Sequence, residues 1–193
     1  MHGKPRTRPY RTVDGHAAAD LVFASVAVPD EALLGSAGGA FAAIDAAVDA
    51  ATAALCAEAV GAMERASEIT LEYLKTREQF GQKFGKFQAL QHRMVDLFME
   101  AEAVALDYDR GDADVGTGTG GDQADALAGE AAHRQGGAAG TQGVQLHGGM
   151  GMTEEYPIGH YYRRLLVIET MFGNTAFHRT RLARALQAEP MSP

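Results

Sequence analysis

The sequence has little of several features that mark common classes of protein. It contains no tryptophan and a single cysteine, Cys56, among its 193 residues. One cysteine excludes an intrachain disulfide framework and a cysteine-based zinc cluster, and it favours a reducing, cytoplasmic location. Histidines are present, but neither His147 nor His160 has neighbours at a spacing typical of zinc ligands. The sequence therefore predicts no metal site.

Positive charge is also scarce. The chain has 17 basic residues against 25 acidic ones, which gives a formal net charge of −8. A field of this sign repels polyanions and argues against binding to nucleic acid or to an anionic membrane. No apolar run approaches the roughly 20 residues of a membrane-spanning helix, so we expect no membrane span. The basic residues 1–11 precede no apolar segment, which argues against a signal peptide and predicts a solvated leader.

The pattern of apolar residues predicts a mostly α-helical chain. Residues 10–28 contain β-forming side chains around the turn pair Asp14-Gly15, which is typical of one β-hairpin. Apolar residues then recur at helical spacing over residues 41–75 and 87–109. The expected fold is a four-helix up-and-down bundle with a short N-terminal β-hairpin.

Glycine marks the expected connections, because the 23 glycines fall mainly between the apolar segments. Each interior glycine costs about 1 kcal/mol of helix propensity relative to alanine, so the glycine-rich third helix is expected to depend on its neighbours. The expected segments are a loop at 76–86, a solvated loop at 112–122, a third helix at 124–144, a glycine-rich loop at 145–156, and helices at 157–171 and 175–187.

Two of these connections contain residues suited to a ligand. In the first, Arg77 precedes Phe80 and Gly81, so a guanidinium could bind a phosphate while a ring stacks on a flat ligand. In the second, Gly148 and Gly149 let the backbone approach an anion closely. A surface arginine beside a buried ring and a tight connection between helices explain the same residues equally simply.

Acid-base candidates are few. Glu169 stands near the end of a predicted helix, where a lone carboxylate is more often a solvated charge than a catalytic base. No set of serine, histidine and aspartate has the pattern of a nucleophilic hydrolase.

Taken in order, the motifs resemble the C-terminal domain of the acyl-CoA dehydrogenases. The series starts with Arg77-x-x-Phe80-Gly81 and Phe87-Gln88, and continues with Gln145-x-x-Gly148-Gly149-x-Gly151 and Glu155-Tyr156-Pro157. The resemblance implies a helical bundle at residues 37–188, preceded at 1–36 by the end of a β-domain and followed by a tail at 189–193. It also implies a homo-oligomer, or a hetero-oligomer with a full-length acyl-CoA dehydrogenase subunit, and an acyl-CoA substrate.

The same resemblance implies FAD as the cofactor. On the family pattern Arg77 would pair with the diphosphate of FAD, and the residues that line or contact the cofactor would be Phe80, Phe87, Gln88, Gln145, Gly148 and Gly149.

The chain departs from the family pattern at the catalytic base. Most members have a glutamate where this sequence has Phe172, and a second branch has one where this sequence has about Ala51. Neither side chain accepts a proton, and Glu169 is a weak substitute. In this respect the sequence resembles the base-lacking small subunits of bacterial heteromeric acyl-CoA dehydrogenases. Because the family's N-terminal domains lie outside the sequence, we expect a flavoprotein component that is inactive alone. The alternative is an assembly module, or a truncated remnant, that binds no flavin.

Overall fold

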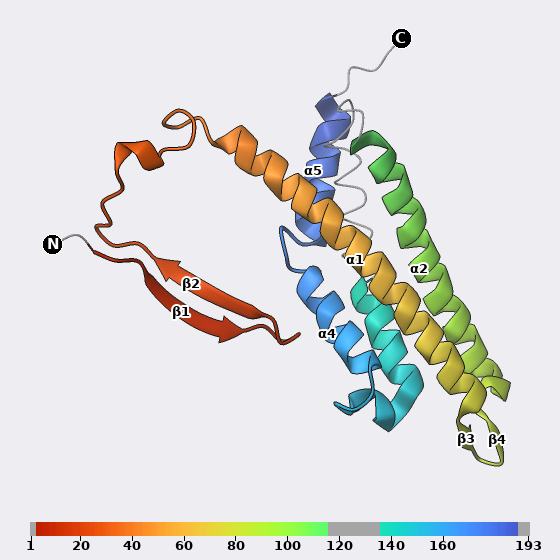
Figure 1. Ribbon diagram of the computed structural model, residues 1–193. Helices are drawn as coiled ribbons and strands as arrows, with labels where there is room; N and C mark the ends of the chain where they lie inside the picture. Colours follow the sequence, from red (N-terminus) through yellow and green to blue (C-terminus); the bar gives the residue numbers. More distant parts are fainter. Residues whose placement is uncertain (1–2, 116–135, 189–193) are drawn as a thin grey trace, which may run out of the picture. The chain divides into compact units, whose positions relative to one another are not determined.

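The computed structural model describes residues 3–115 and 136–188 of the chain (Figure 1). The chain divides into two compact units, Met1–Val48 and Asp49–Pro193. In the described residues, helices predominate and a short antiparallel strand pair lies at the N-terminal side, which confirms the predicted fold class.

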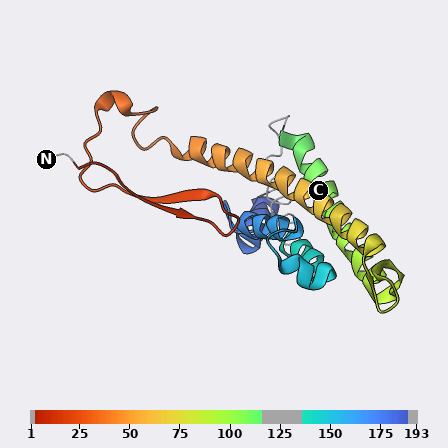
Figure 2. The ribbon, with the colours of Figure 1, turned by 60° about the horizontal axis from the view of Figure 1, so that its bottom comes forward.

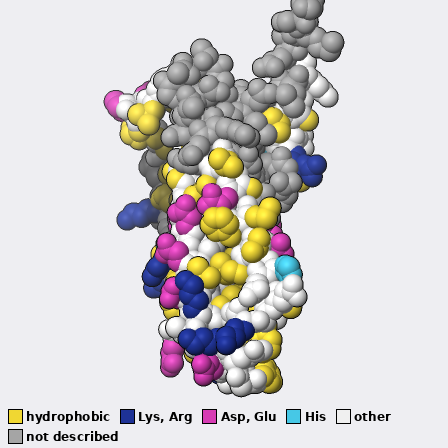
Figure 3. Space-filling view, turned by 90° about the vertical axis from the view of Figure 1, so that its right-hand side faces the viewer, with side chains coloured by type: hydrophobic (Ala, Val, Ile, Leu, Met, Phe, Trp, Pro, Cys, Tyr) yellow, Lys and Arg dark blue, Asp and Glu magenta, His cyan; other side chains and the backbone are white. Residues whose placement is uncertain are grey.

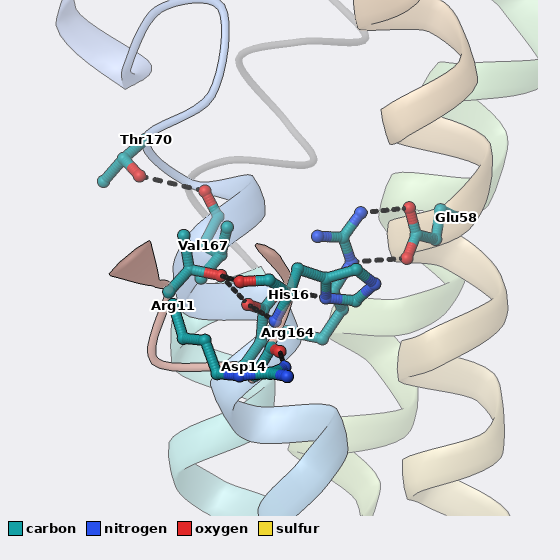
Figure 4. A network of polar contacts seen from close by, with 9 residues as sticks. Arg11, Asp14, His16, Glu58, Arg164, Val167 and Thr170 are labelled. Carbon is teal, nitrogen blue, oxygen red and sulfur yellow. Dashed lines mark hydrogen bonds and ion pairs between the residues drawn. The ribbon is translucent and has the colours of Figure 1, made fainter. Parts of the chain in front are cut away.

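The first unit contains the strand pair. Strand β1 (Arg6–Arg11) pairs with β2 (Ala17–Val22) in antiparallel register, with Arg6 opposite Val22 and Arg11 opposite Ala17. The turn predicted at Asp14-Gly15 is present. In it, Arg11 donates to the Gly15 carbonyl oxygen at 2.7 Å, and His16 lies 3.0 Å from the Asp14 carboxylate (Figure 4).

The predicted bounds of this hairpin were wrong. The pairing begins at Arg6, inside the segment expected to be a solvated leader, and it ends at Val22, so residues 23–28 are not part of a strand. Pro9 is compatible with β1 because each strand of a two-stranded pair has a free edge. A short 3₁₀ helix, Asp30–Ala32, follows before the long helix α1 (Phe41–Thr76).

The second unit is the helical bundle. Helix α1 is followed by a small hairpin, β3 (Glu78–Gln79) with β4 (Gln82–Lys83), then the 3₁₀ helix Phe84–Lys86 and α2 (Gln88–Val115). Both ribbon views show α1 and α2 side by side, joined at the hairpin (Figures 1 and 2). A further helix covers residues 136–147, and α4 (Ile158–Ile168) and α5 (Thr175–Ala188) complete the bundle.

The core of the bundle is shared by four of these helices. Its larger members come from α1 (Leu55, Met63, Leu74), α2 (Leu97, Val104), residues 136–147 (Leu146) and α4 (Leu165, Ile168). The glycines of residues 136–147 pack closely against α4. A Cβ at Gly140 would lie 3.0 Å from the Tyr162 ring, and one at Gly143 would lie 3.0 Å from Ile158. Close packing therefore explains why a glycine-rich segment is helical here.

Ion pairs join α1 to the last two helices. Arg164 of α4 donates to both carboxylate oxygens of Glu58 on α1, at 2.5 and 2.6 Å (Figure 4). Arg181 of α5 makes the same two-pronged contact with Asp49 of α1, with its Nη2 at 2.7 Å from Oδ2. Paired N–H donors on a planar guanidinium fix direction as well as distance, so these contacts hold α4 and α5 in register with α1.

Two further predictions need correction. Residues 112–115 were expected in a loop, but α2 continues through Val115; the remainder of that predicted loop lies outside the described residues, as does the tail at 189–193. Helix α1 is also long and apolar enough to cross a membrane by length and composition, contrary to the expectation that no segment reaches that length. Core helices of soluble proteins pass the same test, so it assigns no membrane to α1.

Candidate functional site

The connection between α1 and α2 presents an aromatic side chain to solvent. Phe80 and Gly81 form the turn of the β3–β4 hairpin with φ angles of 54° and 77°. Two successive positive φ angles are typical of a type I′ turn, which matches the twist of a tight hairpin. The Phe80 side chain is 89% exposed. An exposed ring at the tip of an ordered turn is available to a ligand or a partner.

The backbone of Arg77 is hydrogen-bonded, whereas its side chain is free. Its N–H donates to the Tyr73 carbonyl oxygen at 2.8 Å, and its own carbonyl oxygen accepts from the Phe84 N–H at 2.9 Å. The guanidinium is exposed, and within residues 3–115 and 136–188 it makes no hydrogen bond or ion pair. Its donors are therefore available for an anion.

The glycine-rich turn follows the helix at 136–147 and differs from the prediction in its bounds. Gln145 was expected in the loop but lies in the last turn of the helix, exposed to solvent. Gly148 then takes a φ of 58° and begins the 3₁₀ helix Gly148–Met152. This left-handed conformation is the usual glycine-dependent end of a helix.

Gly149 and Gly151 differ in what surrounds them. A Cβ at Gly149, like one at Gly148, would meet nothing within 4 Å, so the backbone here faces open space. A Cβ at Gly151 would lie 2.6 Å from the Val144 carbonyl oxygen. Gly151 is therefore required by packing, whereas Gly148 and Gly149 leave room for a ligand.

Tyr73 joins the two connections at one end of the bundle. Its hydroxyl donates to the His147 carbonyl oxygen at 3.3 Å, and its ring lies 4.4 Å from the imidazole of His147. Tyr156 packs on the other two rings, at 5.8 Å from Tyr73 and 4.9 Å from His147. Neither Tyr73 nor Tyr156 was predicted as a site residue, because no local spacing pairs residues so distant in the chain.

The aromatic contacts continue from Tyr73 into the first connection. Ring centroids are 6.2 Å apart for Tyr73 and Phe84, 6.3 Å for Phe84 and Phe87, and 6.4 Å for Phe87 and Phe80, all edge to face. Gln88, the first residue of α2, follows Phe87 and is exposed. The structure therefore brings the residues predicted around Arg77 to the same end of the bundle as the turn that follows Gln145.

The buried imidazole of His147 packs between the rings of Tyr73 and Tyr156. Its Nδ1 lies 2.8 Å from the Gly143 carbonyl oxygen, so the neutral ring carries its proton on Nδ1. Burial lowers the pKa of the imidazole, which keeps the ring neutral. His147 is 1% exposed and sits between two tyrosine rings, so its position is that of a packing residue.

A second set of contacts fixes the exit of the glycine-rich turn. Arg163 of α4 donates to both carboxylate oxygens of Glu154, at 2.6 and 3.0 Å, and this pairing lowers the pKa of Glu154. His160 lies 3.2 Å from the Glu154 carbonyl oxygen and 2.9 Å from Arg163. His147 and His160 thus have separate structural partners. In the part of the chain that the structure describes, no cluster of three or more His, Cys, Asp or Glu could hold a metal ion.

The predicted base positions lie elsewhere in the bundle. Phe172 follows α4 in a left-handed conformation, with a φ of 54°, and Ala51 lies on α1 and is half-buried. Glu169 caps α4, and its Oε2 would lie 2.7 Å from a Cβ at Gly137, so this carboxylate packs against the helix at 136–147. The assignments of these residues, and of the cofactor residues, remain predictions.

Comparisons with known proteins give the family. A family model described as "Acyl-CoA dehydrogenase, C-terminal domain" matches residues 37–187. The chain is 41% identical over 117 residues to the acyl-CoA dehydrogenase IpdE2 of Mycobacterium tuberculosis, covering 60% of this chain and 35% of the relative.

Solved structures agree with this match. Butyryl-CoA dehydrogenase from Megasphaera elsdenii superimposes with a TM-score of 0.86 at 27% identity, covering 93% of this chain and 48% of that one. The "Tcur3481-Tcur3483 steroid ACAD G363A variant" superimposes with a TM-score of 0.82 at 28% identity, covering 95% and 48%. The chain thus spans about half the length of these relatives or less.

Proposed function

Since the chain belongs to the acyl-CoA dehydrogenase family through its C-terminal domain, we propose that its bundle binds part of FAD in an acyl-CoA dehydrogenase assembly and supplies no catalytic base. One observation carries this proposal. The structure brings a free arginine, an exposed aromatic ring and an open glycine turn to one end of the bundle, although the two connections are 74 residues apart at Tyr73 and His147.

The residues at this end fit the chemistry of FAD. The free guanidinium of Arg77 suits the diphosphate, because a planar fork of N–H donors matches phosphate oxygens. Phe80 offers an exposed ring for a flat heterocycle. Gln145 and the open backbone at Gly148 and Gly149 offer polar contacts at close range. Phe87 and Gln88 complete the set, with Phe87 supporting the ring of Phe80.

When bound in an acyl-CoA dehydrogenase, FAD accepts a hydride from the β carbon of the acyl thioester. In this proposal the bundle orients the cofactor and excludes water from its diphosphate. The proton on the α carbon needs a carboxylate, and Phe172 and Ala51 have none. Glu169 contacts Gly137 instead. In this proposal a different subunit therefore supplies the base.

Assembly with another subunit belongs to the same proposal. The name of one structural relative joins two proteins, Tcur3481 and Tcur3483, in one steroid acyl-CoA dehydrogenase. A partner of this kind would supply the glutamate that is absent at position 172. We propose a cytoplasmic location for the assembly, in keeping with a single cysteine, Cys56, which is buried.

FAD and riboflavin, which lacks the diphosphate and adenosine, together test the cofactor assignment. The full chain is titrated with each flavin while flavin fluorescence is followed. We expect FAD to bind more tightly than riboflavin, and Arg77→Ala to weaken FAD binding at least about tenfold, the loss of one charge-assisted contact. Riboflavin binding should not change. Arg184→Ala is the matched control, because Arg184 is an exposed arginine on α5.

The outcomes separate the two functions considered for this chain. If Arg77→Ala binds FAD as tightly as the unaltered chain does, the diphosphate assignment is wrong. If the unaltered chain binds neither flavin, the bundle is an assembly module that does not hold the cofactor by itself.

A further inference from the structure

The outer face of α1 and α2 contains a groove whose lining includes none of the candidate cofactor residues. The groove measures about 410 Å³, and its apolar lining includes Leu71 of α1 with Met94, Phe98 and Ala101 of α2. Phe98 is 54% exposed, although a phenylalanine in a finished core would be covered. Figure 3 shows hydrophobic side chains gathered on this side of the bundle, with acidic ones among them.

The apolar surface continues along α2 beyond the groove itself. Val95, Met99 and Leu106 are more than half exposed, and they recur on one side of the helix at spacings of four and seven residues. An apolar stripe of this length, interrupted on the same side by Glu102, is typical on a helical bundle of a surface that another helix covers.

The rim of the groove is acidic on both walls. Glu64 and Glu68 come from α1, and Glu102 comes from α2. Glu68 pairs with Arg65 on its own helix at 2.6 Å. Glu64 and Glu102 make no ion pair with any residue in the described ranges. Each wall therefore keeps one uncompensated carboxylate beside the apolar floor.

We propose that this groove binds an amphipathic helix of a different subunit, one whose apolar face is flanked by lysine or arginine. Basic side chains on both flanks would meet Glu64 on one wall and Glu102 on the other, while the apolar face covers Phe98 and Leu71. Two copies of this chain that met through the groove about a two-fold axis would bring two acidic rims together, and like charges at that range oppose association.

This inference deepens the assembly part of the proposed function, but its test involves no flavin. Failure of the FAD experiment therefore leaves it standing, and its own failure leaves the cofactor assignment standing.

Two synthetic helical peptides of equal length test the charge preference directly. Both have the same leucine face; one is flanked by lysines and the other by glutamates. Each is labelled with a dye, and its fluorescence anisotropy is followed as the full chain is added. We expect the lysine peptide to bind about tenfold more tightly or better, and its affinity to fall as salt is raised.

Variants of the groove identify where the peptides bind. Glu64→Lys with Glu102→Lys should reverse the preference in favour of the glutamate peptide. The control is Glu31→Lys with Asp45→Lys, which changes the net charge equally at exposed residues outside the groove. Phe98→Asp should abolish binding of the lysine peptide, with circular dichroism used to verify that the bundle remains folded.

Two results would overturn the proposal. Equal binding of the two peptides, or an unchanged preference in the charge-reversed variant, would show that the acidic rim does not select the occupant. A fall in the solution mass of the chain alone on Phe98→Asp would show that a second copy of this chain occupies the groove.

Discussion

Replacing Gly140 by alanine should destabilise the bundle, although alanine is the better helix former. Gly140 lies in the helix at 136–147, where a Cβ would be 3.0 Å from Cδ2 of Tyr162 and 3.3 Å from the Cα of the same residue. The ring can rotate away, but the Cα belongs to the backbone of α4. The two helices would therefore have to separate by a few tenths of an ångström.

The expected magnitude follows from two opposing effects. Alanine improves helix propensity by about 1 kcal/mol relative to glycine. Overpacking of a close contact costs about 1–3 kcal/mol, and the backbone contact places Gly140 in the upper part of that range. The free energy of unfolding should therefore fall by about 1 kcal/mol.

Gly61→Ala is the matched control. Gly61 lies on α1, and a Cβ there would meet nothing within 4 Å. Alanine should therefore raise the free energy of unfolding at this position by about 0.5–1 kcal/mol. The two variants should differ by about 2 kcal/mol, or about 4–8 °C in Tm for a chain of this size.

Thermal unfolding followed by circular dichroism at 222 nm measures this difference. If Gly140→Ala raises Tm as much as Gly61→Ala does, the glycines of residues 136–147 are not required by packing against α4.

Two further substitutions test contacts inside the bundle. Asp49→Asn should lower the free energy of unfolding by about 1–2 kcal/mol, because it removes the charge of the carboxylate that pairs with Arg181, a side chain only 20% exposed. Urea denaturation measures this change, with Asp45→Asn on the same helix as the exposed control. Burial lowers the pKa of His147 and of His178, so both rings stay neutral in the fold and the unfolded chain binds more protons below about pH 6.5. The midpoint of urea denaturation should therefore be constant above about pH 7 and fall as the pH drops from there to 5. His147→Phe, which keeps a ring between the two tyrosines, should make that fall shallower, and an unchanged slope would contradict the assignment to His147.

The sequence predicted a helix well where apolar residues recur at helical spacing, as in α1. The predicted helix ends were wrong where glycine and acidic residues were interpreted as a loop. Helix α2 continues to Val115 because adding residues to an existing helix costs far less than starting one. At Gln145 the prediction ended the helix too early. Gly143 packs against Ile158 within the helix, and Gly148 is the residue that takes the left-handed conformation.

The start of the N-terminal strand was placed too late for a related reason. Residues 6–11 include three arginines and Pro9, and only Thr7 and Tyr10 are of the β-branched or aromatic types that predict a strand. Residues 6–11 form a strand because they pair with β2, and not because of their composition.

The candidate site could also be predicted only in part. Arg77 and the glycines were identifiable from their motifs, but Tyr73 and Tyr156 act only through contacts between distant segments. A single sequence contains no periodic signal for such pairs. The two ligand-suited connections could be predicted separately, whereas the side chains that join them could not.

The fold does not require phenylalanine at position 172, so the lack of a glutamate there concerns the catalytic base. The turn after α4 is defined by positive φ angles at Phe172 and Gly173 and by Asn174, whose side-chain oxygen accepts from the Phe177 N–H at 3.0 Å. A Cβ at Gly173 would lie 2.3 Å from the Phe177 ring, so glycine is required there. Nothing comparable requires phenylalanine at 172, where the side chain is 40% exposed and the left-handed conformation suits a bulky ring no better than a glutamate. The turn would therefore accept a glutamate at position 172. The absence of a carboxylate there agrees with the proposed function, in which another subunit supplies the catalytic base.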